Sequence, residues 1–173
     1  MRLRCALREH RNSLKDLGYR GRMSESPRER IPGYLGALAV FGSAWATVAH
    51  LATRRGTTVH FSLLDLVVGG VATHKFARIV SKAGVATPLR APFTVYEGEA
   101  GSGEVNERPR DEHPQHTIGE LLTCPFCLAP WVATGYAGGL VVEPRVARIW
   151  AAAFSVVAVS DFLQHAYARV RTE

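Results

Sequence analysis

The chain has 173 residues, a formal net charge of +6 and a mean hydropathy of zero, values that a soluble single domain would also have. The charges are nevertheless segregated: residues 31–53 and 121–142 contain no Asp, Glu, Lys or Arg, and each run is long enough to cross about 30 Å of hydrocarbon as a helix. This distribution excludes an ordinary water-soluble domain. The basic residues flank apolar segments and no nucleic-acid-reading motif is present, which argues against nucleic acid as a partner.

Residues 1–30 are predicted to form a flexible basic tail, because they hold nine Lys or Arg and four acidic residues. No cleavable signal peptide is expected, since the first apolar run starts near residue 31 and lacks a small-residue cleavage site. Met23 is an alternative start to Met1. Residues 31–173 are predicted to form one multi-pass membrane domain.

Four hydrophobic segments are expected in chain order, at about residues 32–52, 61–80, 130–142 and 146–167. They predict an all-α fold, a small helical membrane bundle with three to four transmembrane helices. The segment at 61–80 decides between three and four crossings, because Asp65 and the pair His74 and Lys75 shorten its apolar part.

Residues 81–116 are predicted to be a polar loop between the second and third segments. Six Gly or Pro residues fall before residue 104, and the prolines within residues 86–94 favour an extended or turn-like chain. Residues 97–116 have the mixed charge and low hydrophobicity of a flexible loop. Thr117 to Glu120 match a capping box, which predicts that a short helix begins at Thr117.

The positions of Lys and Arg predict the orientation. With four crossings, 17 of these residues lie on the side of the two termini and the polar loop, and four lie on the other side. Cytoplasmic segments carry the excess of positive charge. Both termini are therefore predicted to be cytoplasmic, in a cell (inner) membrane whose lipid bilayer is the first partner.

Cys124-Pro-Phe-Cys127 is the segment with the most reactive side chains. A C-x-x-C pair at a helix start has three interpretations: a redox-active dithiol with Cys124 as catalytic nucleophile and Cys127 as resolving thiol, half of a metal site, or a structural pair. We expect the two sulfur atoms to lie close together near the start of the third segment. In a reducing cytoplasm they would be free or metal-bound.

A zinc site would need two further ligands beside the cysteines. His113 and His116 lie outside the usual finger spacing, so His74 and His165 are the candidates that folding would have to bring near. Without that convergence, no cofactor is expected.

Other polar and small residues predict contacts between helices. Asp161 and His165 share a helical face and are expected to bond each other or to pair with Lys75 or Arg78. Glu120 is expected to pair with Arg78 or Arg90. Structural or interaction roles are assigned to Lys75, Arg78, Arg90, Glu120, Trp131, Asp161 and the GxxxG pair Gly135 and Gly139.

Several blocks in residues 60–168 resemble a known family. They are His74-Lys75-Phe-Ala-Arg78-Ile, Thr87-Pro-Leu-Arg90-Ala-Pro-Phe-Thr94, Tyr96-Glu97, Glu104-Val-Asn106-Glu107, Gly119-Glu120-Leu-Leu-Thr-Cys124-Pro-Phe-Cys127-Leu and Trp131. Together they are similar to the family catalogued as domain of unknown function 1360, small bacterial and phage integral membrane proteins, some linked to sporulation. The resemblance implies membrane residence, and it brings no established activity or catalytic residue.

The leading functional prediction is a non-enzymatic scaffold or accessory component of the membrane. Its partner would be a second copy or another membrane protein, bound through helix packing and the polar loop. The alternative is a membrane thiol-disulfide or metal-binding protein that uses Cys124 and Cys127. Transport ranks last, because four short helices leave little room for a substrate path.

Overall fold

A computed structural model describes residues 30–54, 60–111 and 115–171. Four long helices and a small polar unit make up this part of the chain. The elements in order are α2 (Ile31–Arg54), α3 (Leu63–Lys82), the 3-10 turn η1 (Gly84–Ala86), α4 (Thr87–Arg90), β1 (Thr94–Gly101), β2 (Glu104–Pro109), α5 (Gln115–Thr123), α6 (Pro125–Val142) and α7 (Pro144–Arg171).

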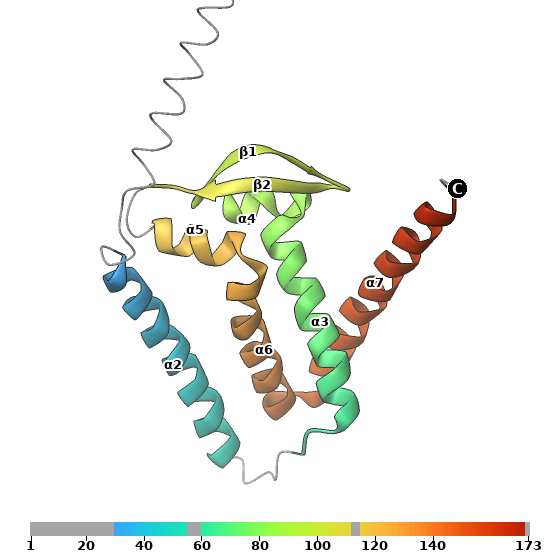
Figure 1. Cartoon of the computed structure of the whole chain (residues 1–173). Coiled ribbons are helices and arrows are strands. Elements are labelled where there is room, and N and C mark those ends of the chain that lie inside the picture. Colours follow the sequence, from blue (N-terminus) through green and yellow to red (C-terminus); the bar gives the residue numbers. More distant parts are fainter. Residues whose placement is uncertain (1–29, 55–59, 112–114, 172–173) are drawn as a thin grey trace, which may run out of the picture.

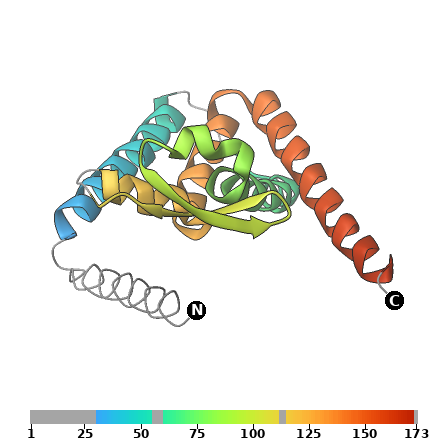
Figure 2. The same ribbon diagram turned by 90° about the horizontal axis from the view of Figure 1, so that it is seen from above.

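The long helices α2, α3, α6 and α7 run alternately in opposite directions (Figure 1). The elements η1, α4, β1, β2 and α5, which we call the cap, lie over one end of them. Figure 2 shows the hairpin across the ends of the central helices, whereas α7 diverges from them. The start of α2 and the end of α7 lie on the cap side, which is the geometry expected for four crossings.

Three of the helices, α2, α6 and α7, are long and apolar enough to cross a membrane. Most of their apolar side chains face outward; Leu38, Val156 and Phe162 are all exposed. In a bilayer such surfaces contact lipid at no cost. The predicted all-α class is confirmed, and the two-stranded sheet is a minor part of the fold.

The predicted helix boundaries need two corrections. Helix α6 begins at Pro125 instead of 130, because Cys124 caps it and Pro125 occupies the first turn, where its missing N–H costs nothing. Pro130 lies inside the helix and removes only one backbone bond. Helix α5 begins at Gln115, so Thr117 is not its N-cap and the capping-box prediction is wrong.

The prediction of an irregular loop over residues 81–116 is wrong for the described residues. Strands β1 and β2 pair antiparallel from Thr94 opposite Pro109 to Gly101 opposite Glu104. The reversal uses three residues with positive φ, Gly101 (86°), Ser102 (51°) and Gly103 (77°), which explains the two glycines. The high polarity that suggested a loop instead reflects a hairpin with one well-solvated face.

Small side chains form the contact between α3 and α7. Ala72, Ala77, Ala147, Ala151 and Ala158 are all buried. Such residues let two helix backbones approach closely, which is how membrane helices gain packing energy without a hydrophobic driving force. An aromatic cluster of Phe76, Tyr136, Trp150 and Phe154 then joins α3, α6 and α7, with ring centroids 5.0–5.9 Å apart.

The assignments to Trp131, Gly135 and Gly139 have different outcomes. Trp131 packs edge-on against Phe41 of α2, with ring centroids 5.1 Å apart. A Cβ on Gly139 would lie 3.2 Å from that of Ala147, so Gly139 is a close-packing site. Gly135 is exposed and a Cβ there would meet nothing within 4 Å, whereas the glycine that faces α2 is Gly138, beneath Val48.

Candidate functional site

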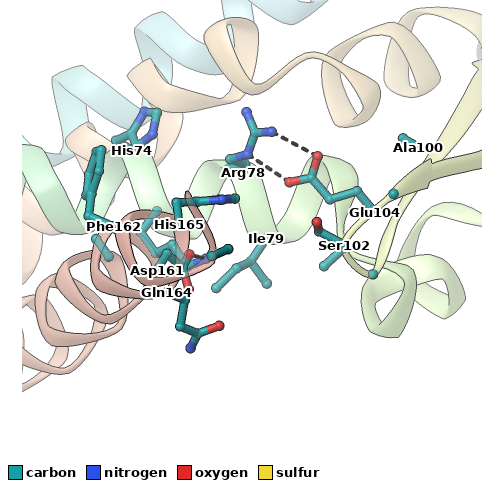
Figure 3. A pocket seen from close by; sticks show the side chains of 16 residues that line it. His74, Arg78, Ile79, Ala100, Ser102, Glu104, Asp161, Phe162, Gln164 and His165 are labelled. Atoms are coloured by element: carbon teal, nitrogen blue, oxygen red, sulfur yellow. Dashed lines mark hydrogen bonds and ion pairs between the residues drawn. The ribbon is translucent and has the colours of Figure 1, made fainter. Parts of the chain in front are cut away.

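A cavity of about 670 Å³ with several ionisable side chains in its lining lies between α3, α7 and the hairpin turn (Figure 3). Its ionisable and amide side chains come from elements far apart in sequence. They are His74, Lys75 and Arg78 of α3, Glu104 of β2, and Asp161, Gln164 and His165 of α7. Five of these seven residues were singled out from the sequence, and folding brings all five to one site.

Helical spacing explains how α3 and α7 line the cavity. His74 and Arg78 are separated by four residues, as are Asp161 and His165, so each pair occupies one helix face. Lys75 Nζ donates to Asp161 Oδ2 and ties the two helices together. Of the partners expected for Asp161, which were His165, Lys75 or Arg78, the structure has Lys75.

Arg78 connects α3 to the hairpin. Its Nε and Nη2 atoms donate to Oε1 and Oε2 of Glu104, both at 2.8 Å, in the two-point geometry that guanidinium and carboxylate favour. The expected partner of Arg78, Glu120, was therefore wrong. Glu104 belongs to one of the blocks that carry the family resemblance, but only the hairpin places it opposite α3.

The two histidines of the cavity are less constrained. His74 and His165 are both exposed, and neither forms a hydrogen bond or ion pair with another described residue. Figure 3 shows His165 extending from α7 across the cavity toward Arg78. A neutral imidazole offers one donor and one acceptor, so both rings are available to an incoming polar group.

A buried ion pair fixes the cap above this cavity. Arg90 is 0 % exposed, and its Nε and Nη2 atoms donate to Glu107 at 2.9 and 3.0 Å. Its remaining donors reach the carbonyl oxygens of Val80 at 2.5 Å and Ala83 at 3.1 Å. Arg90 thereby joins β2 to the end of α3, and its predicted pairing with Glu120 is wrong.

The carboxylate of Glu107 is also fully hydrogen-bonded. Thr94 donates to its Oε2 at 2.7 Å and Thr87 to its Oε1 at 3.1 Å. Burial raises the pKa of Glu107, but the hydrogen bonds from Arg90, Thr94 and Thr87 outweigh it and hold the pKa below its ordinary value. Glu107 therefore stays charged beside Arg90.

Glu120 attaches α5 to the start of α2. It accepts from Arg30 at 2.9 Å and from the Tyr34 hydroxyl at 2.8 Å, and His116 Nε2 lies 3.2 Å away. The sequence predicted that Glu120 ties the polar segment to the bundle. The tie exists, but its partner helix is α2 instead of α3.

A second ion pair between α3 and α7 lies at the end opposite the cap. Arg148 donates to both oxygens of Asp65, at 2.8 and 3.1 Å. Ser62 is the N-cap of α3 and forms a capping box with Asp65, and Tyr136 donates to the backbone oxygen of Asp65 at 3.1 Å. Sequence reasoning missed this pair, although the opposite charges at matching helix ends were a usable signal.

The two cysteines lie together outside the cavity, at the junction of α5 and α6. Their Sγ atoms are 2.7 Å apart and the thiols are free, which confirms the predicted proximity. Cys124 Sγ also accepts from the backbone N–H of Cys127 at 3.2 Å. His74 and His165 line the cavity instead of joining the thiols.

The described residues contain no group of three His, Cys, Asp or Glu side chains positioned to hold a metal ion. The basic tail at 1–29, including Met23, lies outside the described residues, as does His113.

Comparison with known proteins gives a family and nothing more specific. The model of a family described as "Protein of unknown function (DUF1360)" matches residues 68–167, which is more than half of the chain. The matched range contains most of α3, the cap, α6 and most of α7, and therefore all seven ionisable or amide residues of the cavity. No curated protein and no solved structure matches the chain.

Proposed function

We propose that this chain, which belongs to the DUF1360 family, is a non-enzymatic scaffold or accessory component of a bacterial cell (inner) membrane that presents its cap to a partner protein. The observation that carries the proposal is the buried Arg90–Glu107 pair. It holds a polar hairpin in one orientation on the helices, while Tyr96 on that hairpin is 57 % exposed. A fixed hairpin with exposed aromatic and polar side chains suits protein recognition.

The proposed orientation places the cap in the cytoplasm. The positive-inside rule favours this side, because the Lys and Arg excess lies with the cap and the termini. We take α3 as a fourth crossing. Its Lys75 and Asp65 charges are each paired with α7, and such pairing reduces the cost of placing them in a membrane.

Site-specific photo-crosslinking in cells tests the scaffold role. A crosslinking residue at Tyr96 should give a discrete protein adduct, and the same residue at lipid-facing Val156 should not. The adduct should disappear when Glu107→Ala loosens the cap, and differently tagged copies reveal whether the partner is a second copy. Absence of any protein adduct at Tyr96, or an equal adduct at Val156, would refute the role.

The thiol alternative rests on the 2.7 Å separation of the two sulfur atoms and on the exposure of Cys127. In that mechanism the Cys124 thiolate attacks a partner disulfide and releases one partner thiol. Cys127 then displaces the second partner thiol, so the partner is reduced and a Cys124–Cys127 disulfide forms. A Cys127→Ser variant would trap the mixed disulfide, and a Cys124→Ser variant would not.

Labelling intact and lysed cells with a membrane-impermeant thiol reagent tests the orientation, and its result bears on both proposals. A cytoplasmic pair is labelled only after lysis. Labelling of both cysteines in intact cells would reverse the orientation and favour the thiol mechanism, because an oxidising compartment supports disulfide exchange.

A further inference from the structure

We infer that the cavity between α3, α7 and the hairpin turn binds the headgroup of a phospholipid that carries a primary amine and a phosphodiester. The inference does not depend on the scaffold role, but it rests on the proposed crossing of α3. It rests on the charge balance of the cavity, on donors that its ion pairs leave unused, and on its position along the helices.

The cavity contains charges of both signs in equal number. Lys75 and Arg78 supply two cations, and Asp161 and Glu104 supply two carboxylates. A ligand with a single charge would leave one of these groups facing a like charge. A zwitterion matches both signs, with its ammonium toward the carboxylates and its phosphate toward the cations.

The ion pairs leave enough hydrogen-bonding capacity for such a ligand. Lys75 uses one of three N–H groups on Asp161, and Arg78 directs only Nε and Nη2 at Glu104. His165 lies between the two pairs and has no described partner. The phosphate therefore accepts from Arg78 and His165, and the amine donates to the free lone pairs of Glu104 and Asp161.

The position of the cavity favours a lipid over a soluble ligand. Lys75 lies ten residues from Asp65 along α3, about 15 Å at the α-helical rise, whereas hydrocarbon is about 30 Å thick. With α3 as the proposed fourth crossing, the Lys75–Asp161 pair lies at a depth where acyl chains would normally contact it. A headgroup drawn into the cavity satisfies these charges, and Phe162, which lines the cavity and is exposed, offers an apolar surface to the acyl chains.

Native mass spectrometry of the full chain in detergent, titrated with single lipids, tests the inference. Phosphatidylethanolamine should be retained about tenfold more than phosphatidylcholine, which has the same charges but no N–H donors on its quaternary ammonium. Phosphatidylglycerol, which has no cation, should also be retained about tenfold less. Equal or stronger retention of either competitor would overturn the inference.

Two variants and a control locate the binding. Glu104→Gln keeps an acceptor for Arg78 but removes the charge that faces the amine, and His165→Ala removes a phosphate donor; each should lower phosphatidylethanolamine retention several-fold. Glu99→Gln, an exposed change on β1 outside the cavity, should not. Unchanged retention in Glu104→Gln would place the lipid elsewhere and overturn the inference.

A soluble competitor separates lipid from free phosphodiester. Glycerophosphoethanolamine carries the same headgroup without acyl chains, and we expect it not to displace bound phosphatidylethanolamine at equal concentration. Equal competition would show that the cavity recognises the headgroup alone, and it would overturn the lipid assignment.

Discussion

The cap and the helix bundle are held together in opposite ways. At the centre of the cap is a charged pair, Arg90 with 0 % and Glu107 with 2 % of its side chain exposed. The α3–α7 contact is made of small apolar residues such as Ala72 and Ala151, both at 0 %. Each region uses what its surroundings make favourable: the cap is too polar and short for an apolar core, and helices in lipid gain nothing from burying larger apolar surface.

Two ion pairs bracket the central part of the α3–α7 contact. Lys75–Asp161 lies toward the cap and Asp65–Arg148 lies at the opposite end, with Ala72, Ala151 and Ala158 between them. The two pairs have opposite polarity, because α3 supplies the cation Lys75 in one and the anion Asp65 in the other. Sliding or rotation of α7 along α3 would therefore separate both pairs. We therefore read the small residues as the source of packing energy and the ion pairs as the source of register.

Of the variants proposed here, the one that removes a partner of the cap's buried ion pair should lower the stability of the protein most. Arg90→Ala leaves Glu107 charged and buried without its main donor, which costs about 3–5 kcal/mol in comparable pairs. The thermal midpoint in detergent should fall sharply, and hairpin amides should exchange hydrogen faster.

Arg108→Ala, on the strand that carries Glu107, is the matched control. Its guanidinium is 37 % exposed and lies 3.7 Å from Glu97, a geometry worth at most about 1 kcal/mol. If both variants shifted the midpoint equally, the cap would not depend on the buried pair, and the contrast between cap and bundle would fail.

Adjacent glycines in α3 test the packing of the bundle. A Cβ on Gly69 would overlap the ring of Tyr136, whereas one on Gly70 would meet nothing within 4 Å. Gly69→Ala should therefore destabilise the protein by about 1–3 kcal/mol through overpacking. Gly70→Ala should stabilise it by up to about 1 kcal/mol through helix propensity. If the thermal midpoints of the two variants moved in the same direction, this description of the packing would be contradicted.

The same contrast explains what the sequence could predict. Helix positions follow from uninterrupted apolar runs, and Lys75 with Asp161 could be expected because charges within a membrane segment need partners. The cap could not be predicted in this way. Its hairpin has too few apolar residues to show a strand period, and Arg90 and Glu107 are ordinary charged residues until the pairing of β1 with β2 brings them together. The partner of Arg78 was mistaken for the same reason. Glu120 was mistaken because its partners, Arg30 and Tyr34, meet it only when α5 packs against the start of α2.

The pH dependence of stability should separate the cap from the bundle. The folded-state pKa of Glu107 is lowered, so its contribution is fully present above the unfolded pKa, near 4.5, and is lost as pH falls through the folded value. The difference in thermal midpoint between the wild type and Glu107→Gln should therefore be greatest at neutral pH and should narrow below about pH 4.5. Glu97→Gln, at a half-exposed position, is the control and should change the thermal midpoint little. A Glu107→Gln difference that widened on acidification would mean that the buried carboxyl is already protonated.

The smallest effect is expected at the junction of cap and bundle, where Cys124 caps α6. A serine hydroxyl also accepts from the backbone N–H that Cys124 Sγ binds at 3.2 Å, and serine is among the preferred N-cap residues. Cys124→Ser should therefore change stability by no more than about 0.5 kcal/mol, and Cys124→Ala, which has no acceptor, should cost about 1 kcal/mol.

If the cysteine pair is structural, the yield of the Tyr96 crosslink and the cellular phenotype of each variant should follow the stability of that variant. Cys124→Ser should then behave as the wild type. The decisive contrary result is a serine variant that is as stable as the wild type yet inactive in the cell. Serine can replace Cys124 as the N-cap residue of α6 but cannot form a thiolate, so that result would assign the C-x-x-C pair to redox chemistry.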